Sequence, residues 1–236
     1  MSEAPLVHVD GLEVRRDGFA LRIGEWRLEP GQVVGLVGPN GAGKTTMLET
    51  LAGLRPASGG TVRVFGRDPW RDPAGVRSSL GFMSDEMPVF DLRIGALLRL
   101  LSGYYDSWDA ALAGELLDRF KLDPRQKAHK LSKGQGTRLR LVTAMAFRPR
   151  VLLLDEPATG LDLAGRRSLL ESVLEVVRDP QRSVVVSSHQ LLDVQRIADR
   201  LLVINGGSVV VDGRTDDLVG EDRTLEEAME AWGAAG

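Results

Sequence analysis

The sequence predicts an α/β protein with a parallel-sheet core, antiparallel strands at its N-terminus and an α-helical subdomain inserted into the core. Three observations carry this prediction. Short all-apolar runs at 33–37, 151–154, 184–186 and 201–204 have the length and branched residues of strands buried on both faces of a parallel sheet. A glycine-rich segment follows the first run and leads into a helical pattern. Between about residues 84 and 150 the spacing of apolar residues becomes that of helices.

The composition is that of a globular protein without disulfides. The chain has 236 residues, 43% of them hydrophobic and 27% charged, which allows one large domain or two small ones. It contains no cysteine, which suits a reducing compartment. A net charge of −3 gives no sign of a nucleic-acid-binding surface, so no nucleic-acid partner is expected. No apolar run reaches the ~20 residues of a membrane span, and the charged N-terminus does not resemble a signal peptide. We therefore expect a chain that does not itself cross a membrane.

Short alternating stretches surround the first buried run. Residues 6–30 alternate apolar and polar side chains and contain Asp10-Gly11 and Asp17-Gly18, which predicts antiparallel strands with turns at these two dipeptides. Residues 61–66 form another alternating stretch, after a loop rich in glycine, serine and proline. These strands are expected beside the parallel core.

A phosphate-binding motif follows the run at 33–37. Residues 38–46 read GPNGAGKTT and match the P-loop template G-x-x-x-x-G-K-[ST] in full. The glycines let backbone N–H groups turn toward a polyphosphate, and the helix N-terminus behind them favours negative charge. Lys44 would reach the β- and γ-phosphates, and the Thr45 hydroxyl would coordinate Mg²⁺. The alternative, an ordinary glycine turn, requires a chance match at every fixed position. We expect a P-loop NTPase core. Its nucleotide-binding residues would be Asn40, Gly41, Ala42, Gly43, Lys44, Thr45 and Thr46.

Three helices are predicted between residues 84 and 150, and a second anion-binding segment precedes the third. Ser132 lies just before that helix, with Gly134 and Gln135 in its first turn. Such a segment can bind an anion, although it can also be an ordinary helix cap. Because the insert separates it from the P-loop, one chain cannot easily aim both at the same γ-phosphate. A two-fold dimer could, with each nucleotide between one subunit's P-loop and the other's Ser132.

Polar side chains end two of the buried strands. Asp155 and Glu156 follow the run at 151–154, at the sheet edge where open α/β proteins bind ligands. We expect Asp155 to hold Mg²⁺ through water and Glu156 to polarise the attacking water. His189 ends another strand and could donate a hydrogen bond to the γ-phosphate and orient that water. The alternatives are a strand that simply ends in a charged turn and a structural histidine.

The rest of the chain would complete the sheet and its covering helices. Apolar spacing predicts helices near 169–177 and 191–198, and Asn205-Gly206-Gly207 predicts a hairpin. Residues 224–227 have the shape of a capping box and would open a final acidic helix. We therefore expect one domain over 1–236. Its parts would be an α/β core at 1–83 and 151–214, a helical subdomain at 84–150 and a C-terminal helix at 215–236.

The motifs GPNGAGKTT, LSKGQ, LLLDEP, ATGLD and SSH occur in this order, and the series resembles the nucleotide-binding subunit of ABC transporters over essentially the whole chain. The resemblance implies an ATP hydrolase that uses ATP and Mg²⁺ as a nucleotide-sandwich dimer, with itself or with a paralogous subunit. It places Asp162 on the loop where the two subunits touch, and it makes Lys44, Glu156 and His189 the expected catalytic residues. It also implies polytopic membrane permease subunits as partners, and hence a cytoplasmic position on the inner face of the cell membrane.

Finer features resemble exporter-type ATPases that pair with separate membrane subunits. These are the aromatic cluster at 104–109, Lys133 in the signature segment and the C-terminal residues 224–228. Core packing is the alternative explanation of the aromatic cluster. The transported substrate would be decided by the membrane chains.

Two positions depart from the family pattern. Asp85 stands where a glutamine usually joins the core to the helical insert and contacts Mg²⁺. A carboxylate can ligate Mg²⁺, but it adds negative charge beside the γ-phosphate. We therefore expect Asp85 to slow basal hydrolysis or make it more dependent on Mg²⁺. Arg15 and Arg16 stand where an adenine-stacking tyrosine is usual, with Phe19 the nearest ring. Arg16 could stack on the base through its guanidinium plane.

Two other functions are compatible with some of the same motifs. A soluble ABC-type ATPase could act on ribosomes, DNA or cofactor assembly, but such relatives usually carry two of these domains or a long coiled-coil insert, and this chain has neither. A nucleotide-sensing module without hydrolysis is the other alternative, and Glu156, Asp162 and His189 together argue against it. The leading prediction is an ATPase subunit that powers transport, in the direction of export.

Overall fold

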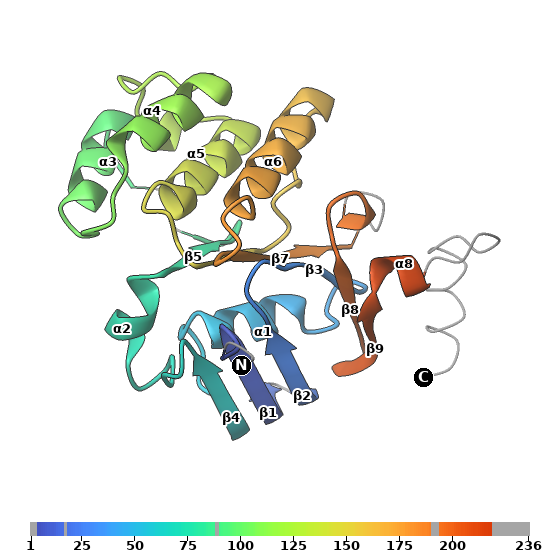
Figure 1. The fold of residues 1–236 in the computed structure, drawn as a ribbon. Coiled ribbons are helices and arrows are strands. Elements are labelled where there is room, and N and C mark those ends of the chain that lie inside the picture. Colours follow the sequence, from blue (N-terminus) through green and yellow to red (C-terminus); the bar gives the residue numbers. More distant parts are fainter. Residues whose placement is uncertain (1–3, 17, 88–89, 190–193, 219–236) are drawn as a thin grey trace.

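One mixed β-sheet organises the fold. The computed structural model describes residues 4–16, 18–87, 90–189 and 194–218, and in them nine strands join in the order β4-β1-β2-β9-β8-β3-β7-β6-β5 (Figure 1). The strands are β1 (Val7–Arg16), β2 (Phe19–Leu28), β3 (Val33–Val37), β4 (Gly59–Val64), β5 (Leu80–Met83), β6 (Val151–Leu154), β7 (Ser183–Ser188), β8 (Arg200–Asn205) and β9 (Ser208–Arg214). The helices are α1 (Lys44–Leu51), α2 (Pro73–Arg77), α3 (Ile94–Ser102), α4 (Ala110–Arg119), the 3₁₀ helix η1 (Ala128–Lys130), α5 (Lys133–Met145), α6 (Leu163–Val176) and α8 (Thr215–Leu218).

The parallel part of the sheet consists of β5, β6, β7, β3 and β8. Its strands are buried on both faces, and alternate residues enter two different apolar cores. On β3, Val33 and Val37 face the core shared with α5 and α6, whereas Val34 and Leu36 face the core shared with α1 and the N-terminal strands. This double burial is why these strands are short all-apolar runs. The predicted parallel core is confirmed.

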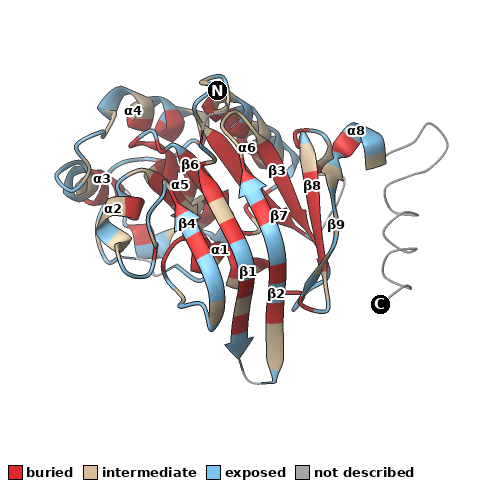
Figure 2. Cartoon of the chain, turned by 60° about the horizontal axis from the view of Figure 1, so that its bottom comes forward, coloured by how far each residue is buried: buried red, intermediate tan, exposed pale blue. Residues whose placement is uncertain are grey.

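The antiparallel part forms the other end of the sheet. β1 pairs with β2 and β4, and β9 returns along β8 through the predicted hairpin at 205–207. β1 and β2 alternate between buried and more exposed residues (Figure 2). One turn prediction is wrong, because Asp10-Gly11 lies inside β1. Gly11 has a φ of +59°, and the register against β4 shifts between Asp10 and Glu13, so the dipeptide forms a bulge while pairing with β2 continues.

The helical insert covers one face of the sheet. Helices α3, α4 and α5 lie with α6 on one side of the parallel strands, and α1 lies on the other (Figure 1). The three predicted helices and the inserted helical region are therefore confirmed. The helix predicted at 191–198 lies partly outside the described residues, and the final helix from 224 lies wholly outside them. None of the helices in the described part of the chain is long and apolar enough to span a membrane.

A bidentate ion pair joins helix α4 of the insert to helix α6 of the core. Arg119 of α4 donates to both carboxylate oxygens of Glu175 on α6, over 2.7 and 3.0 Å, and to the hydroxyl of Ser172 over 3.1 Å. Both charged side chains are about one-third exposed. Because the planar guanidinium fits a carboxylate with two parallel bonds, this pair fixes the relative direction of the two helices.

We predict that Arg119→Met lowers the free energy of unfolding by about 1 kcal/mol, since a partly exposed bidentate pair is lost. In a chain of this size the melting temperature would fall by about 2–4 °C, which differential scanning calorimetry can measure. Arg125→Met is the matched control, because its pair with Asp123 is local and the arginine is 86% exposed. Equal melting temperatures for the two variants would contradict the prediction.

Candidate functional site

The P-loop is shaped by a glycine at the start of α1. Gly43 is the N-cap residue of α1 and has a φ of +111°, a backbone conformation that residues other than glycine rarely adopt. A Cβ at this position would lie 2.9 Å from Leu21 Cδ1 and 3.1 Å from Phe19 Cζ. Backbone conformation and close packing therefore both require glycine here. The ring of Phe19 lies directly beside the predicted phosphate-binding residues, whereas Arg16 is its cross-strand partner on β1.

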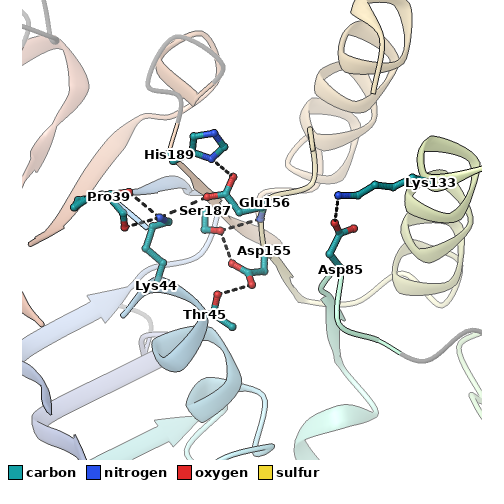
Figure 3. A network of polar contacts seen from close by, with 10 residues as sticks. Pro39, Lys44, Thr45, Asp85, Lys133, Asp155, Glu156, Ser187 and His189 are labelled. Atoms are coloured by element: carbon teal, nitrogen blue, oxygen red, sulfur yellow. Dashed lines mark hydrogen bonds and ion pairs between the residues drawn. The ribbon is translucent and has the colours of Figure 1, made fainter. Parts of the chain in front are cut away.

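Lys44 places a buried cation at this loop. Its side chain is 6% exposed, and Nζ donates hydrogen bonds to the carbonyl oxygens of Gly38, over 2.7 Å, and Pro39, over 3.1 Å. The same nitrogen lies 3.5 Å from Oε1 of Glu156 (Figure 3). The lysine thus connects the loop after β3 with the carboxylate that follows β6.

The two residues expected closest to Mg²⁺ meet through a hydrogen bond. Thr45 Oγ1 donates to Asp155 Oδ2 over 2.7 Å, and Ser187 Oγ donates to Asp155 Oδ1 over 2.6 Å (Figure 3). The described residues contain no group of three or more His, Cys, Asp or Glu side chains that could hold a metal by themselves. Mg²⁺ commonly binds one or two carboxylates and completes its shell with water and substrate phosphates. Thr45 and Asp155 fit a Mg²⁺ site of that kind.

Glu156 lies between a lysine and a histidine. Its Oε2 is 2.8 Å from His189 Nδ1, while Oε1 is shielded from solvent and accepts no hydrogen bond from the described residues. The residue has a φ of +48°, a left-handed conformation that costs energy for a non-glycine residue and is held by the surroundings. Its N–H donates to Ser187 Oγ over 2.9 Å. Glu156 and His189 also line a cavity of about 180 Å³, so a carboxylate and an imidazole face one small space.

The predicted second anion-binding segment forms the start of α5. Ser132 and Gln135 make a capping box: Ser132 Oγ accepts from the N–H of Gln135 over 3.3 Å, and Gln135 Oε1 accepts from the N–H of Ser132 over 3.0 Å. A Cβ on Gly134 would lie 2.7 Å from the carbonyl oxygen of Gly160. In the described part of the chain these contacts keep the segment on α5 and against the loop after β6, and none reaches the P-loop. Within one chain, Ser132 therefore acts as the cap of α5.

Asp162 and Asp85 contact partners other than Thr45 and Asp155. Asp162 is the N-cap of α6, accepts from the N–H of Gly165 over 2.8 Å, and pairs with Arg138 of α5. Its side chain is 70% exposed. Mg²⁺ ligation by Asp85 stays a prediction, and among the described residues its carboxylate makes no hydrogen bond or ion pair with Thr45 or Asp155. Its carboxylate instead points to α5 and pairs with Lys133 (Figure 3).

Sequence reasoning missed Ser187. This buried serine joins the two neighbouring carboxyl residues, because its hydroxyl donates to Asp155 and accepts from the N–H of Glu156. The only signal was its place in the SSH segment, which pointed to His189 alone. A serine that follows an apolar run on a buried strand is a polar group that needs hydrogen-bond partners.

Comparisons with known proteins agree with this geometry. A family model described as "ABC transporter" matches residues 21–159. The chain is 30% identical over 223 residues to the ABC transporter ATP-binding protein YtrB of Bacillus subtilis (strain 168), covering 94% of this chain and 74% of that protein. It is 35% identical over 223 residues to the daunorubicin resistance ATP-binding protein DrrA3 of Streptomyces coeruleorubidus, covering 91% and 70%. A solved structure of an ATP-binding subunit of an ABC transporter superposes with a TM-score of 0.84 at 25% identity, over 96% of this chain and 99% of that one.

We predict that Ser187→Ala lowers the turnover of nucleotide hydrolysis about ten-fold, because residues that orient a metal-binding carboxylate typically contribute 10–100-fold. Steady-state phosphate release would measure the change. Ser183→Ala is the matched control, since Ser183 is equally buried at the other end of β7 and bonds the carbonyl of Glu29 instead. An equal loss of turnover in both variants would show that β7 stability, and not the contact with Asp155, is responsible.

Proposed function

Because the chain belongs to the ABC transporter family, as an ATP-binding subunit that hydrolyses ATP and powers transport, we propose that it drives export through separate membrane subunits. In this proposal two copies close around two molecules of MgATP. Hydrolysis separates the copies, and the separation moves the membrane subunits.

One observation carries the catalytic part of the proposal. The carboxyl ends of the parallel strands β3, β6 and β7 bring the P-loop, the Asp155–Glu156 pair and His189 to one edge of the sheet (Figure 3), where open α/β sheets bind their ligands. We assign the P-loop N–H groups and Lys44 to the phosphates. Thr45 and Asp155 would hold Mg²⁺, which supplies charge neutralisation to the phosphate oxygens when bound.

Glu156 and His189 would act on the attacking water. The Glu156 side chain is 23% exposed and lines the adjoining cavity, so its carboxylate can take the proton of a water placed there. His189 contacts Oε2 of Glu156, which orients the carboxylate, and its exposed ring can donate to a γ-phosphate from the open side. The left-handed backbone of Glu156 turns its side chain away from that of Asp155, so the two carboxyl groups can serve different functions.

Two exposed surfaces are evidence for the proposed nucleotide-sandwich dimer. The first turn of α5 exposes Ser132 and Lys133 to solvent, at a helix N-terminus that favours an anion. Beside Asp162, the apolar side chain of Leu163 is 87% exposed, which suits a surface that a second copy covers. Since one chain carries both the P-loop and the Ser132 segment, a homodimer would complete two identical sites.

We predict that Glu156→Gln binds ATP but lowers steady-state phosphate release by at least about 100-fold, since the general base is lost. The stalled protein would accumulate as an ATP-dependent dimer, which size-exclusion chromatography with light scattering can detect. ADP in place of ATP, and EDTA in place of Mg²⁺, are the matched controls and should give monomer. Unaltered turnover of this variant would remove Glu156 as the base.

A groove between the core and the insert is a candidate docking site for a membrane partner. A cavity of about 210 Å³ is lined mainly by apolar residues of β5 and the insert, among them Leu101, Tyr105 and Phe147. Phe90 at this cavity is 50% exposed.

The aromatic cluster of the insert lies at the same groove. Tyr105 stacks on Phe147 with ring centroids 3.9 Å apart, and the burial of Tyr105 raises the pKa of its phenol. Core packing therefore explains Tyr105, whereas Tyr104 is 68% exposed and requires another explanation. We infer that the membrane subunits dock at this groove.

The proposed direction of transport, export, is based on the name of one relative. DrrA3 is named for daunorubicin resistance, which supports export by a chain that shares 35% of its residues with it. The transported substrate would be decided by the membrane subunits.

We predict that gentle affinity purification of this chain from its native cells retains a stoichiometric polytopic membrane protein, identified by mass spectrometry. Phe90→Asp should release that partner, because it places a charge at an apolar docking groove. Trp70→Asp is the matched control, since Trp70 is 52% exposed and does not line the groove. Recovery only with ribosomes, DNA or assembly proteins would favour the soluble ABC-type ATPase instead.

A further inference from the structure

One carboxylate lies between two cations of the same helix. Asp85, which follows β5, places Oδ2 3.2 Å from Lys133 Nζ and Oδ1 3.5 Å from Arg140 Nη1. Lys133 and Arg140 are seven residues apart on α5, which is about two helical turns and puts them on one face. A single side chain at the junction of β5 and the insert therefore contacts α5 at two places, about two turns apart.

Both cations pair with this carboxylate, and Arg140 also donates to the carbonyl oxygen of Met87 over 3.3 Å. Lys133 is the first residue of α5, where the positive end of the helix disfavours a basic side chain. Arg140 is only 17% exposed, and its Nε is buried without a hydrogen-bond partner. In the part of the chain that the structure describes, Asp85 is the carboxylate within ion-pair distance of either cation. A buried or misplaced cation without its partner is costly, so Asp85 stabilises this position of α5.

The same turn of α5 is also fixed from the other side. The stem of Lys133 packs on Gly160, where an added Cβ would meet Lys133 Cγ and Cδ at 3.3 Å. Gly134 lies so close to the Gly160 carbonyl that no side chain fits between them. The first turn is therefore located by Asp85 after β5 and by Gly160 after β6. This is the turn that contains Ser132 and Gly134.

We propose that Asp85 is a positioning residue, which holds the first turn of α5 in the orientation that meets the nucleotide of a second copy. This role rests on the proposed nucleotide-sandwich dimer. It differs from Mg²⁺ ligation, because the carboxylate is directed to α5 and not to Thr45 or Asp155. A glutamine at this position could not neutralise the two cations, so Asp85 and Lys133 form a matched pair in this chain.

The test is a double-mutant cycle in the Glu156→Gln background, with the ATP concentration for half-maximal dimerisation as the readout at saturating Mg²⁺. Asp85→Asn and Lys133→Gln should each raise that concentration about two- to five-fold, the range for partly exposed ion pairs. The double variant should be no worse than Asp85→Asn alone, because that change already removes the contact with Lys133. Asp85→Glu should restore part of the loss. Lys133 is 63% exposed, so Lys133→Gln should fold normally. It tests the same contact if Asp85→Asn fails to fold.

Asp123→Asn is the matched control, because Asp123 pairs locally with Arg125 in the same insert over 3.1 Å, in the segment between α4 and η1. It should leave ATP-dependent dimerisation unchanged. Additive effects at Asp85 and Lys133 would overturn the proposal. A rise in the Mg²⁺ concentration for half-maximal dimerisation on Asp85→Asn, with no change for ATP, would overturn it in favour of metal ligation. Failure of the Glu156→Gln background itself to dimerise would instead overturn the sandwich dimer, and this role with it.

Discussion

The geometry of the nucleotide site depends on the hydrogen bonds that one buried carboxylate requires. Asp155 is 6% exposed, and an ionised carboxylate at that depth requires hydrogen-bond donors. The donors are the hydroxyls of Thr45, at the start of α1, and Ser187, near the end of β7. These bonds connect the P-loop helix with two neighbouring strands. They also depend on strand register, since a slip of β7 by one residue would turn Ser187 to the opposite face of the sheet. The apolar pairing of β3, β6 and β7 thus determines the polar geometry at their ends.

The helical insert is joined to the core by apolar packing and by ion pairs at two places. Its buried residues belong to the same apolar core as α6 and one face of β3. Arg119–Glu175 joins α4 to α6, and Asp85 contacts α5 close to its first turn. Apolar contacts bring the surfaces together but are not directional. The ion pairs have defined geometry, so they restrict how α4 and α5 are oriented over the sheet.

The parts predictable from sequence are those that local chemistry determines. The P-loop is a contiguous motif, and strands buried on both faces need apolar residues throughout, so both are visible in the chain. Asp10-Gly11 has the composition of a turn, but pairing with β2 on one side and β4 on the other keeps it within β1. The partners of Asp85 are about fifty residues away in sequence, so nothing near it indicates an ion pair with α5. The SSH segment gave no reason to select Ser187, because its role comes from two residues that follow another strand, Asp155 and Glu156.

The loop from Glu156 to Asp162 connects the two halves of the proposed dimer site within one chain. At its start, Glu156 contacts Lys44 and His189, which belong to this chain's own nucleotide site. At its end, Asp162 caps α6 and pairs with Arg138 of α5. Between them, Gly160 supports Gly134, in the turn that this chain would present to a second copy. Close-packed contacts of this kind transmit displacement because they leave no space to absorb it. In the proposed dimer, a displacement of Glu156 would therefore also shift the turn offered to the other nucleotide, and the two sites would be physically connected.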